Sequence, residues 1–125
     1  MSIKVLVADD NLIMRNLVKY YLSKHAIDNV LEAKDGVEAL QIIKANEIDV
    51  LFLDLRMPNL DGFNVANYLN SGDKKVTIIA FSADMTKENE KILKSLDVKY
   101  FLKKPIEPKL CNDIIKKILK ENNQV

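Results

Sequence analysis

The sequence has little of several residue types, and each shortage narrows what the protein can be. Among 125 residues there is a single cysteine, Cys111. It excludes an internal disulfide framework and a cysteine-ligated metal cluster, and it fits a reducing compartment. An excess of one charge is missing too, because 19 Lys and Arg face 18 Asp and Glu, a net charge of +1. That balance gives no electrostatic footprint for nucleic acid or for an anionic membrane, so we expect neither as a partner.

Long hydrophobic runs are also absent. No segment approaches the roughly 20 apolar residues that span a bilayer, and the apolar run near the N-terminus is too short for a signal peptide. We therefore expect a cytoplasmic protein. Its length fits one domain over residues 1–125, which buries about two-thirds of its unfolded surface without a disulfide or metal staple. From about residue 121 onward, a polar end is expected to fray.

Five short apolar runs, rich in β-branched residues, predict strands. Three of them, IKVLVA, VLFL and VTIIAF, are nearly continuous rather than alternating. Continuous apolar runs are typical of strands that are buried on both faces, as in a parallel sheet. The predicted strands cover residues 3–8, 29–33, 49–53, 76–81 and 99–102.

Amphipathic segments between these runs predict helices. The first covers residues 12–24, with Ile13, Leu17 and Tyr21 on one face. The other four are marked by Val37, Leu40 and Ile42/Ile43 after Asp35-Gly36; by Phe63, Ala66 and Leu69 before Ser71-Gly72; by Ile92, Leu93 and Leu96 after the N-cap Thr86; and by Leu110, Ile114 and Ile118 after Pro108. Five strand–helix alternations with right-handed crossovers predict a three-layer α/β sandwich around a parallel sheet.

Reactive side chains follow four of the five predicted strands. Because ligands bind beyond the carboxyl ends of parallel strands, these side chains should meet at one edge of the sheet. The second strand ends in Glu32-Ala33-Lys34, which offers no comparable chemistry and suits an edge position. The others deliver Asp9 and Asp10, then Asp54, then Ser82, and finally Lys103 and Lys104 before Pro105.

This set of side chains predicts phosphoryl chemistry. Three carboxylates drawn together repel one another, so either protons or a cation must compensate them. Mg²⁺ suits all-oxygen ligands, and a lysine and a hydroxyl beside it would bind a phosphoryl group. Asp54 could then act as a nucleophile that forms an acyl phosphate. Taken singly, Asp and Ser at strand ends are often only turn or cap residues, so the prediction depends on their joint occurrence.

Five motifs, VADDN, KDGVEAL, DVLFLDLRMPNLDG, FSA and FLKKPI, occur in this order between residues 7 and 106, and the similarity that they support covers residue 3 to about residue 119. With them the chain resembles the receiver domain of two-component response regulators, in particular the single-domain type typified by the chemotaxis regulator CheY. The resemblance implies a flavodoxin-like (βα)5 fold with strand order 2-1-3-4-5. It also implies a protein that accepts a phosphoryl group from a histidine kinase or a histidine phosphotransfer protein. Such a protein is no enzyme beyond catalysing its own aspartyl phosphorylation and dephosphorylation.

The resemblance also implies roles for single residues. Asp54 matches the phosphoacceptor. Asp10 matches a direct Mg²⁺ ligand, Asp9 a residue that holds a metal-bound water, and Arg56 a ligand through its backbone carbonyl. Ser82 matches the hydroxyl that binds phosphoryl oxygens in the active state.

Two further matches lie near the last strand. Lys104 matches the family's lysine, in a peptide bond with Pro105 that is expected to be cis. Phe101 matches the switch aromatic, while Tyr100 should point to the opposite face of the sheet. Arg56 and Asp84 flank the phosphorylation site, and we hypothesise that they pair across it and obstruct the attacking water.

The output of such a switch is expected at the face built from the fourth helix, the fifth strand and the fifth helix. A chemotaxis-type regulator, a phosphorelay shuttle and a receiver excised from a larger regulator remain open. Three rival functions are weaker. An aspartate-nucleophile phosphatase of the haloacid-dehalogenase type needs a second catalytic Asp where this chain has Arg56. An FMN-binding module needs hydrogen-bond donors for the flavin phosphate where this chain has carboxylates. A metal-insensitive scaffold would not need the complete set of site residues.

Overall fold

Five parallel strands form one sheet in the order β2-β1-β3-β4-β5. The computed structural model describes residues 3–122 of the chain. The strands are β1 (Val5–Ala8), β2 (Val30–Ala33), β3 (Val50–Asp54), β4 (Thr77–Ser82) and β5 (Tyr100–Lys103). The predicted fold class and strand order are confirmed, and β3 is the central strand.

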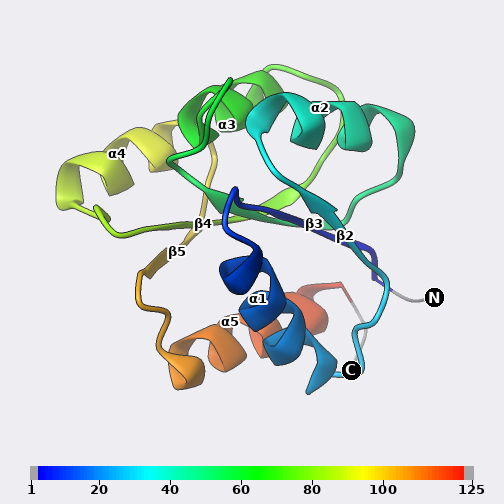
Figure 1. Ribbon diagram of the computed structural model, residues 1–125. Coiled ribbons are helices and arrows are strands. Elements are labelled where there is room, and N and C mark those ends of the chain that lie inside the picture. Colours follow the sequence, from blue (N-terminus) through cyan, green and yellow to red (C-terminus); the bar gives the residue numbers. More distant parts are fainter. Residues whose placement is uncertain (1–2, 123–125) are drawn as a thin grey trace.

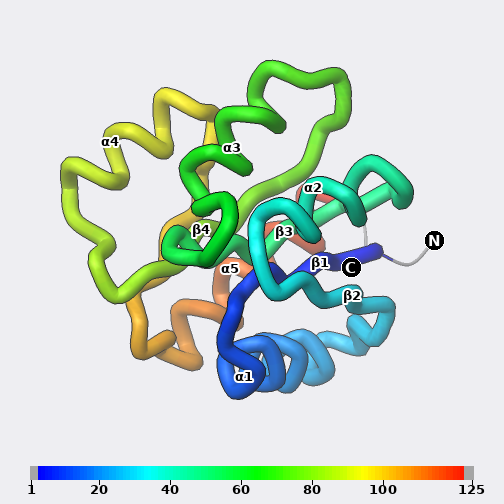
Figure 2. The backbone as a smooth tube through the Cα atoms, turned by 45° about the horizontal axis from the view of Figure 1, so that its top comes forward, coloured from blue at the N-terminus to red at the C-terminus, as the bar shows by residue number. Residues whose placement is uncertain are grey.

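Helices cover both faces of this sheet. Figure 1 shows α2, α3 and α4 above it and α1 and α5 below it, and Figure 2 shows the same two layers from a tilted view. The helices are α1 (Leu12–Ser23), α2 (Gly36–Ala45), α3 (Gly62–Asn70), α4 (Lys87–Ser95) and α5 (Pro108–Glu121). None of the helices within residues 3–122 is long and apolar enough to cross a membrane.

Each face of the sheet has its own hydrophobic core. Along β1, Val5 and Val7 belong to the core with α1 and α5, whereas Leu6 and Ala8 belong to the core on the other side. All four side chains are at most 1% exposed. This alternation within a continuous apolar run explains why the runs predicted a sheet covered on both faces.

Polar side chains begin the helices. Asn11 accepts hydrogen bonds from the backbone of Ile13 and Met14 at the start of α1, and Asp61 accepts one from Asn64 at the start of α3. The predicted cap Thr86 is confirmed, since its hydroxyl accepts a hydrogen bond from the Asn89 amide. Such caps satisfy backbone N–H groups that have no partner inside the helix.

The buried faces of several helices differ from the prediction. Ile13 is 76% exposed, while Tyr21 is buried as predicted, together with Val18 and Leu22. In α5, Ile114 and Ile118 are buried as predicted, but Cys111 is buried in place of Leu110, which is 45% exposed. Apolar residues in these helices form overlapping i, i+3 and i, i+4 series, and the helix's approach to the sheet decides which series is buried. The same shift leaves Val37 and Ile92 exposed.

The predicted frayed end begins too early. Glu121 closes α5 and accepts a hydrogen bond of 2.5 Å from the Tyr100 hydroxyl. This bond ties the last turn of α5 to β5, so ordered structure extends through residue 121. The rest of the predicted tail, residues 123–125, lies outside the described residues.

Candidate functional site

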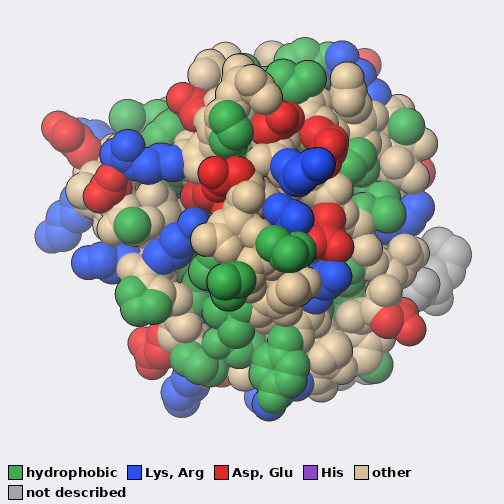
Figure 3. Space-filling model, viewed as in Figure 1, with side chains coloured by type: hydrophobic (Ala, Val, Ile, Leu, Met, Phe, Trp, Pro, Cys, Tyr) green, Lys and Arg blue, Asp and Glu red, His purple; other side chains and the backbone are tan. Residues whose placement is uncertain are grey.

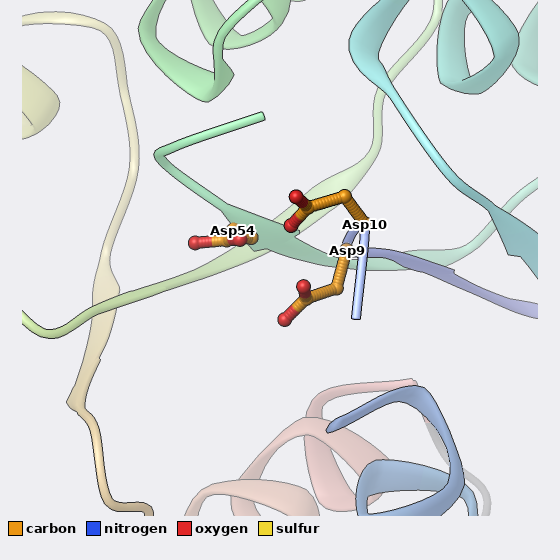
Figure 4. A group of neighbouring side chains, drawn as sticks. All are labelled: Asp9, Asp10 and Asp54. Carbon is orange, nitrogen blue, oxygen red and sulfur yellow. The ribbon is translucent and has the colours of Figure 1, made fainter. Parts of the chain in front are cut away.

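Three carboxylates meet at the carboxyl ends of β1 and β3. Asp9 and Asp10 directly follow β1, and Asp54 is the last residue of β3. One carboxylate oxygen from each of the three lies within 4.8 Å of the others. Figure 4 shows the three side chains extending beyond the ends of these strands into the same region. The structure therefore brings together the acidic residues that the sequence placed at one edge.

Burial makes this cluster electrostatically costly. Asp9 is 0% exposed and Asp54 is 3% exposed, while Asp10 lies at the surface. Burial, and then the neighbouring Asp9 carboxylate, raise the pKa of Asp54 to about 6. An uncompensated negative charge of this kind is the property expected of a cation site.

Lys104 supplies one positive charge to the cluster. Its ammonium lies 3.1 Å from Asp9 Oδ2 and 3.4 Å from Asp54 Oδ1. The backbone N–H of Lys104 donates to the Ser82 carbonyl, which anchors this residue beside β4. The bond from Lys104 to Pro105 is cis, as predicted. One ammonium against three carboxylates still leaves an excess of negative charge.

The donor set fits a hard divalent cation. Carboxylate oxygens from Asp9, Asp10 and Asp54 are the ligands that Mg²⁺ prefers. Arg56, whose carbonyl was expected as a further ligand, follows Asp54 by two residues and lines the same cleft as Asp10. Its amide donates a 3.3 Å hydrogen bond to Asp54 Oδ1, which holds the loop close to that carboxylate.

An open cleft of about 650 Å³ leads to the site. Asp10, Arg56 and Ser82 line it together with Phe63 and Asn89. Figure 3 shows acidic side chains gathered in the upper half of this face of the molecule, with basic side chains among them.

Ser82 is held in place by the loop that follows β4. It is 2% exposed, and its Oγ accepts a 3.1 Å hydrogen bond from the Asp84 amide. The Asp84 carbonyl accepts another, of 2.7 Å, from Asn89 in α4. The Asp84 carboxylate forms an ion pair with Arg56, as hypothesised. Asp84 thus contacts the buried hydroxyl, the first turn of α4 and Arg56 in the loop that follows Asp54.

Phe101 and Tyr100 point to opposite faces of the sheet, as predicted. Phe101 is partly buried against the core under α2, α3 and α4, and Tyr100 belongs to the core under α1 and α5. In the sheet, Phe101 lies beside Ala80 of β4. Ala80 is fully buried, so the Phe101 ring is the partly exposed member of this pair.

Gly62 lets α3 begin directly against the end of β3. A Cβ atom on this residue would lie 2.5 Å from the Asp54 carbonyl oxygen and 2.8 Å from the Leu55 Cα. The Gly62 amide also donates to the Leu55 carbonyl. The loop between β3 and α3 is therefore closed tightly behind the phosphoacceptor candidate.

The start of α2 holds the same loop from its other side. Asn59, with a φ of 68°, donates from its side chain to Asp35 Oδ2 at 2.8 Å. Gly36 lies so close to Leu60 that a Cβ atom would collide with the Leu60 carbonyl. From the sequence, Asp35 and Gly36 were predicted only to begin a helix. Their contact with the loop could not be predicted, because residues 24 positions apart leave no local pattern.

Arg15 and Glu32 were also missed. The Arg15 side chain is 10% exposed, and it donates from Nε to Glu32 at 2.9 Å and from Nη1 to the Asp9 carbonyl at 2.8 Å. One signal could have found it, because Arg15 shares a helix face with Val18 and Leu22, and a buried charge needs a partner.

Comparisons with known proteins agree with this geometry. Residues 5–118 match the response regulator receiver domain. The chemotaxis protein CheY1 of Helicobacter pylori is 30% identical over 123 residues, which cover 96% of this chain and 99% of that protein. The receiver domain of the Francisella response regulator 1452 superposes with a TM-score of 0.88 and 30% identity, over 97% of this chain and 99% of that chain.

A third relative is much longer. The hybrid signal transduction histidine kinase L of Dictyostelium discoideum is 35% identical over 129 aligned positions, which cover 96% of this chain but 7% of the kinase. The chain thus spans a small part of that relative and nearly all of CheY1. The acidic edge, the strand order and these matches agree, and the chain belongs to the receiver domain family of two-component response regulators.

Proposed function

We propose that the protein accepts a phosphoryl group on Asp54 and that this modification switches a protein-binding face. The observation that carries the proposal is the position of Asp54. It lies buried at the end of the central strand, within reach of Lys104 and beside Asp9 and Asp10. A partner kinase or histidine phosphotransfer protein would present its phosphohistidine through the open cleft.

In the transfer step, an Asp54 carboxylate oxygen attacks phosphorus as the bond from phosphorus to the imidazole nitrogen of the donor breaks. The imidazole leaves with the electron pair of that bond and takes up a proton. Asp10, Asp54, the Arg56 carbonyl and, through a water, Asp9 would hold Mg²⁺, whose positive charge would offset that of the phosphoryl oxygens. Lys104 orients one side of the group, since its ammonium already lies 3.4 Å from Asp54 Oδ1.

The switch begins at Ser82. Its hydroxyl, which now accepts from the Asp84 amide, would turn to donate to a phosphoryl oxygen. The loop after β4 would follow, because Asp84 is also bonded to Asn89 in α4. Phe101 would then move inward beside Ala80, which changes the face formed by α4, β5 and α5. This face is where we propose that a downstream protein binds.

The test is phosphorylation by acetyl phosphate and Mg²⁺, read by intact mass. We expect the mass of one phosphoryl group to be added to the wild type. The Asp54→Asn variant should add none, and a chelator should abolish the addition. Unchanged labelling of Asp54→Asn, or no labelling of a folded wild type, would contradict the proposal. Steady turnover of a phosphate monoester such as p-nitrophenyl phosphate would favour the phosphatase alternative instead.

A phosphorelay role is the second candidate, and the match to a hybrid kinase favours it. In that case residues 1–125 form one receiver domain that passes its phosphoryl group on to a histidine of another protein. Phosphorylated protein, freed of acetyl phosphate, would be mixed with a histidine phosphotransfer protein. Rapid appearance of label on the second protein indicates a relay. Retention of label on Asp54, with binding at the α4–β5–α5 face, indicates an endpoint regulator.

A further inference from the structure

We infer that Arg15 is a positioning residue for the acidic pair, and that Glu32 of the edge strand aims it. The inference rests on the proposed function, because it concerns the affinity of the same site for a divalent cation. Arg15 touches neither the phosphoacceptor nor the carboxylate oxygens of the cluster in any contact of the described residues. It acts on the backbone that carries them.

The contact is made to one particular peptide group. Arg15 Nη1 donates to the carbonyl of Asp9 at 2.8 Å, and this carbonyl belongs to the peptide that joins Asp9 to Asp10. On the other side of Asp9, its amide donates to the Ala33 carbonyl at 3.1 Å. The backbone of Asp9 is therefore fixed at both ends, by α1 and by β2.

Asp10 depends on this fixed backbone. Within residues 3–122, no hydrogen bond or ion pair holds its carboxylate, in contrast with the Asp9 carboxylate, which binds the Asn11 amide and Lys104. The direction of the Asp10 side chain is consequently set by the peptide that precedes it. A shift of that peptide would move the Asp10 carboxylate relative to those of Asp9 and Asp54.

Glu32 determines where the guanidinium lies. Its Oε1 accepts from Arg15 Nε at 2.9 Å, and its Oε2 accepts from Lys19 at 2.9 Å. Hydrogen bonds from Lys19 and Arg15 outweigh the effect of burial and lower the pKa of Glu32, so this carboxylate stays ionised at neutral pH. Glu32 lies on β2 beside Val7 of β1, so the sheet itself brings it to Arg15.

The chemistry of arginine suits this task. The planar guanidinium donates from Nε to one partner and from Nη1 to another in a fixed geometry, which the flexible ammonium of lysine cannot reproduce. Partners that orient the ligands of a metal typically change its affinity by about 10- to 100-fold when they are removed. Arg15 binds the backbone that carries Asp10 and not the Asp10 carboxylate itself, so we expect a change in affinity at the lower end of this range.

The experiment measures binding of Mn²⁺ alone, with free Mn²⁺ counted by electron paramagnetic resonance. We expect Arg15→Gln to weaken binding about tenfold, and Arg15→Lys and Glu32→Gln to weaken it by smaller factors. The matched control Lys19→Gln removes an equal charge from the same carboxylate but leaves the Arg15–Asp9 hydrogen bond intact, so it should stay within about twofold of the wild type. Val18→Ala, a core change in the same helix, controls for loss of stability.

A second readout needs no metal. In the metal-free protein, the backbone amide shifts of Asp10 and Asn11 should move in Arg15→Gln and stay in place in Lys19→Gln and Val18→Ala. Equal Mn²⁺ affinity in wild type and folded Arg15→Gln would overturn the inference. Equal weakening in either control would overturn it as well. Failure of the wild type to bind Mn²⁺ would instead contradict the proposed function. If Arg15→Gln does not fold, Arg15→Lys and Glu32→Gln carry the test.

Discussion

Lys104 is paired more closely with Asp9 than with Asp54, at 3.1 Å against 3.4 Å, across 95 residues of sequence. The Asp9 carboxylate is fully buried and also accepts from the Asn11 amide, so it holds the lysine from a fixed position. The ammonium is thus kept beside Asp54, the proposed phosphoacceptor, by a second carboxylate. In the proposed transfer, Lys104 would contact a phosphoryl oxygen while it stays paired with Asp9.

Replacement of Asp54 by Asn should stabilise the metal-free protein at neutral pH. The substitution removes a buried carboxylate whose pKa is raised to about 6 from 3.8 by burial and by Asp9. We expect the free energy of unfolding to increase by about 1–3 kcal/mol. The increase should lie in the lower part of this range, because the substitution also removes the attraction between Asp54 and Lys104. Urea unfolding in the presence of a chelator measures it. A less stable Asp54→Asn protein would show that Asp54 carries no such electrostatic cost.

The pH dependence of stability follows from the same group. Between its unfolded pKa of 3.8 and its folded pKa of about 6, Asp54 binds a proton only in the folded state. Its contribution to stability therefore rises as the pH falls through the folded pKa of about 6, and the rise levels off near the unfolded pKa of 3.8. Urea unfolding at several pH values, without metal, should show this rise in the wild type. Asp54→Asn is the control and should lack it.

At lower pH other carboxyl groups act in the opposite direction. Hydrogen bonds lower the pKa values of Glu32 and Asp35, so the stability that these groups contribute is lost as the pH falls through their folded values. The wild type should consequently be most stable at mildly acidic pH. A stability that falls steadily from neutral pH downward would contradict the sign derived for Asp54.

Replacement of Arg56 by Ala should shorten the lifetime of the phosphorylated protein. Arg56 pairs with Asp84 beside the cleft, and we predict that this pair restricts the approach of the attacking water. The rate of phosphate release after removal of acetyl phosphate should rise severalfold. The pair is solvent-exposed, since the Arg56 and Asp84 side chains are 75% and 52% accessible. The free energy of unfolding should therefore change by less than about 0.5 kcal/mol.

The partner provides the control for Arg56. Asp84→Asn keeps the backbone contacts of Asp84 but removes the charge that holds Arg56. It should accelerate phosphate release as well, and the double variant should be no faster than the faster single variant. Release at the wild-type rate in Arg56→Ala would show that the ion pair does not protect the phosphoryl group.

Gly36→Ala should destabilise the protein, whereas Gly72→Ala should not. A Cβ atom at position 36 collides with the backbone of Leu60, in the loop that follows β3. A Cβ atom at position 72 meets nothing closer than 3.5 Å, the distance to the Tyr68 carbonyl. We expect a loss of about 1–3 kcal/mol for Gly36→Ala, measured by thermal or urea unfolding. Equal effects of the two substitutions would show that the loop yields to the added methyl group.

Local sequence patterns determined much of this fold. The run VLFL predicted a strand buried on both faces, and Leu51 and Phe52 do lie in the two separate cores. The reactive Asp54 was placed at the end of that strand because the apolar run stops there. A continuous apolar run predicts a central strand well, because both faces of such a strand are buried whichever way its side chains point.

Contacts between distant residues were not predictable in the same way. Whether Ile13 or Val18 faced the core depended on how α1 approaches the sheet, which no helix pattern contains. The bonds from Arg15 to Glu32 and from Asn59 to Asp35 join different strands, helices and loops. Both lie around the acidic cluster rather than in it. The composition of the site could therefore be predicted, but the residues that hold its loops in place could not.

The burial of Cys111 in α5 has a practical consequence. Its thiol is 0% exposed, and burial raises its pKa to about 11, so reagents that attack thiolates cannot reach it in the closed structure. Modification of this sulfur would report on how often α5 lifts from the sheet. A second cysteine, introduced on the surface, could carry a dye or a spin label while the native one stays silent. The protein thus contains a built-in probe for the rate at which one helical layer opens.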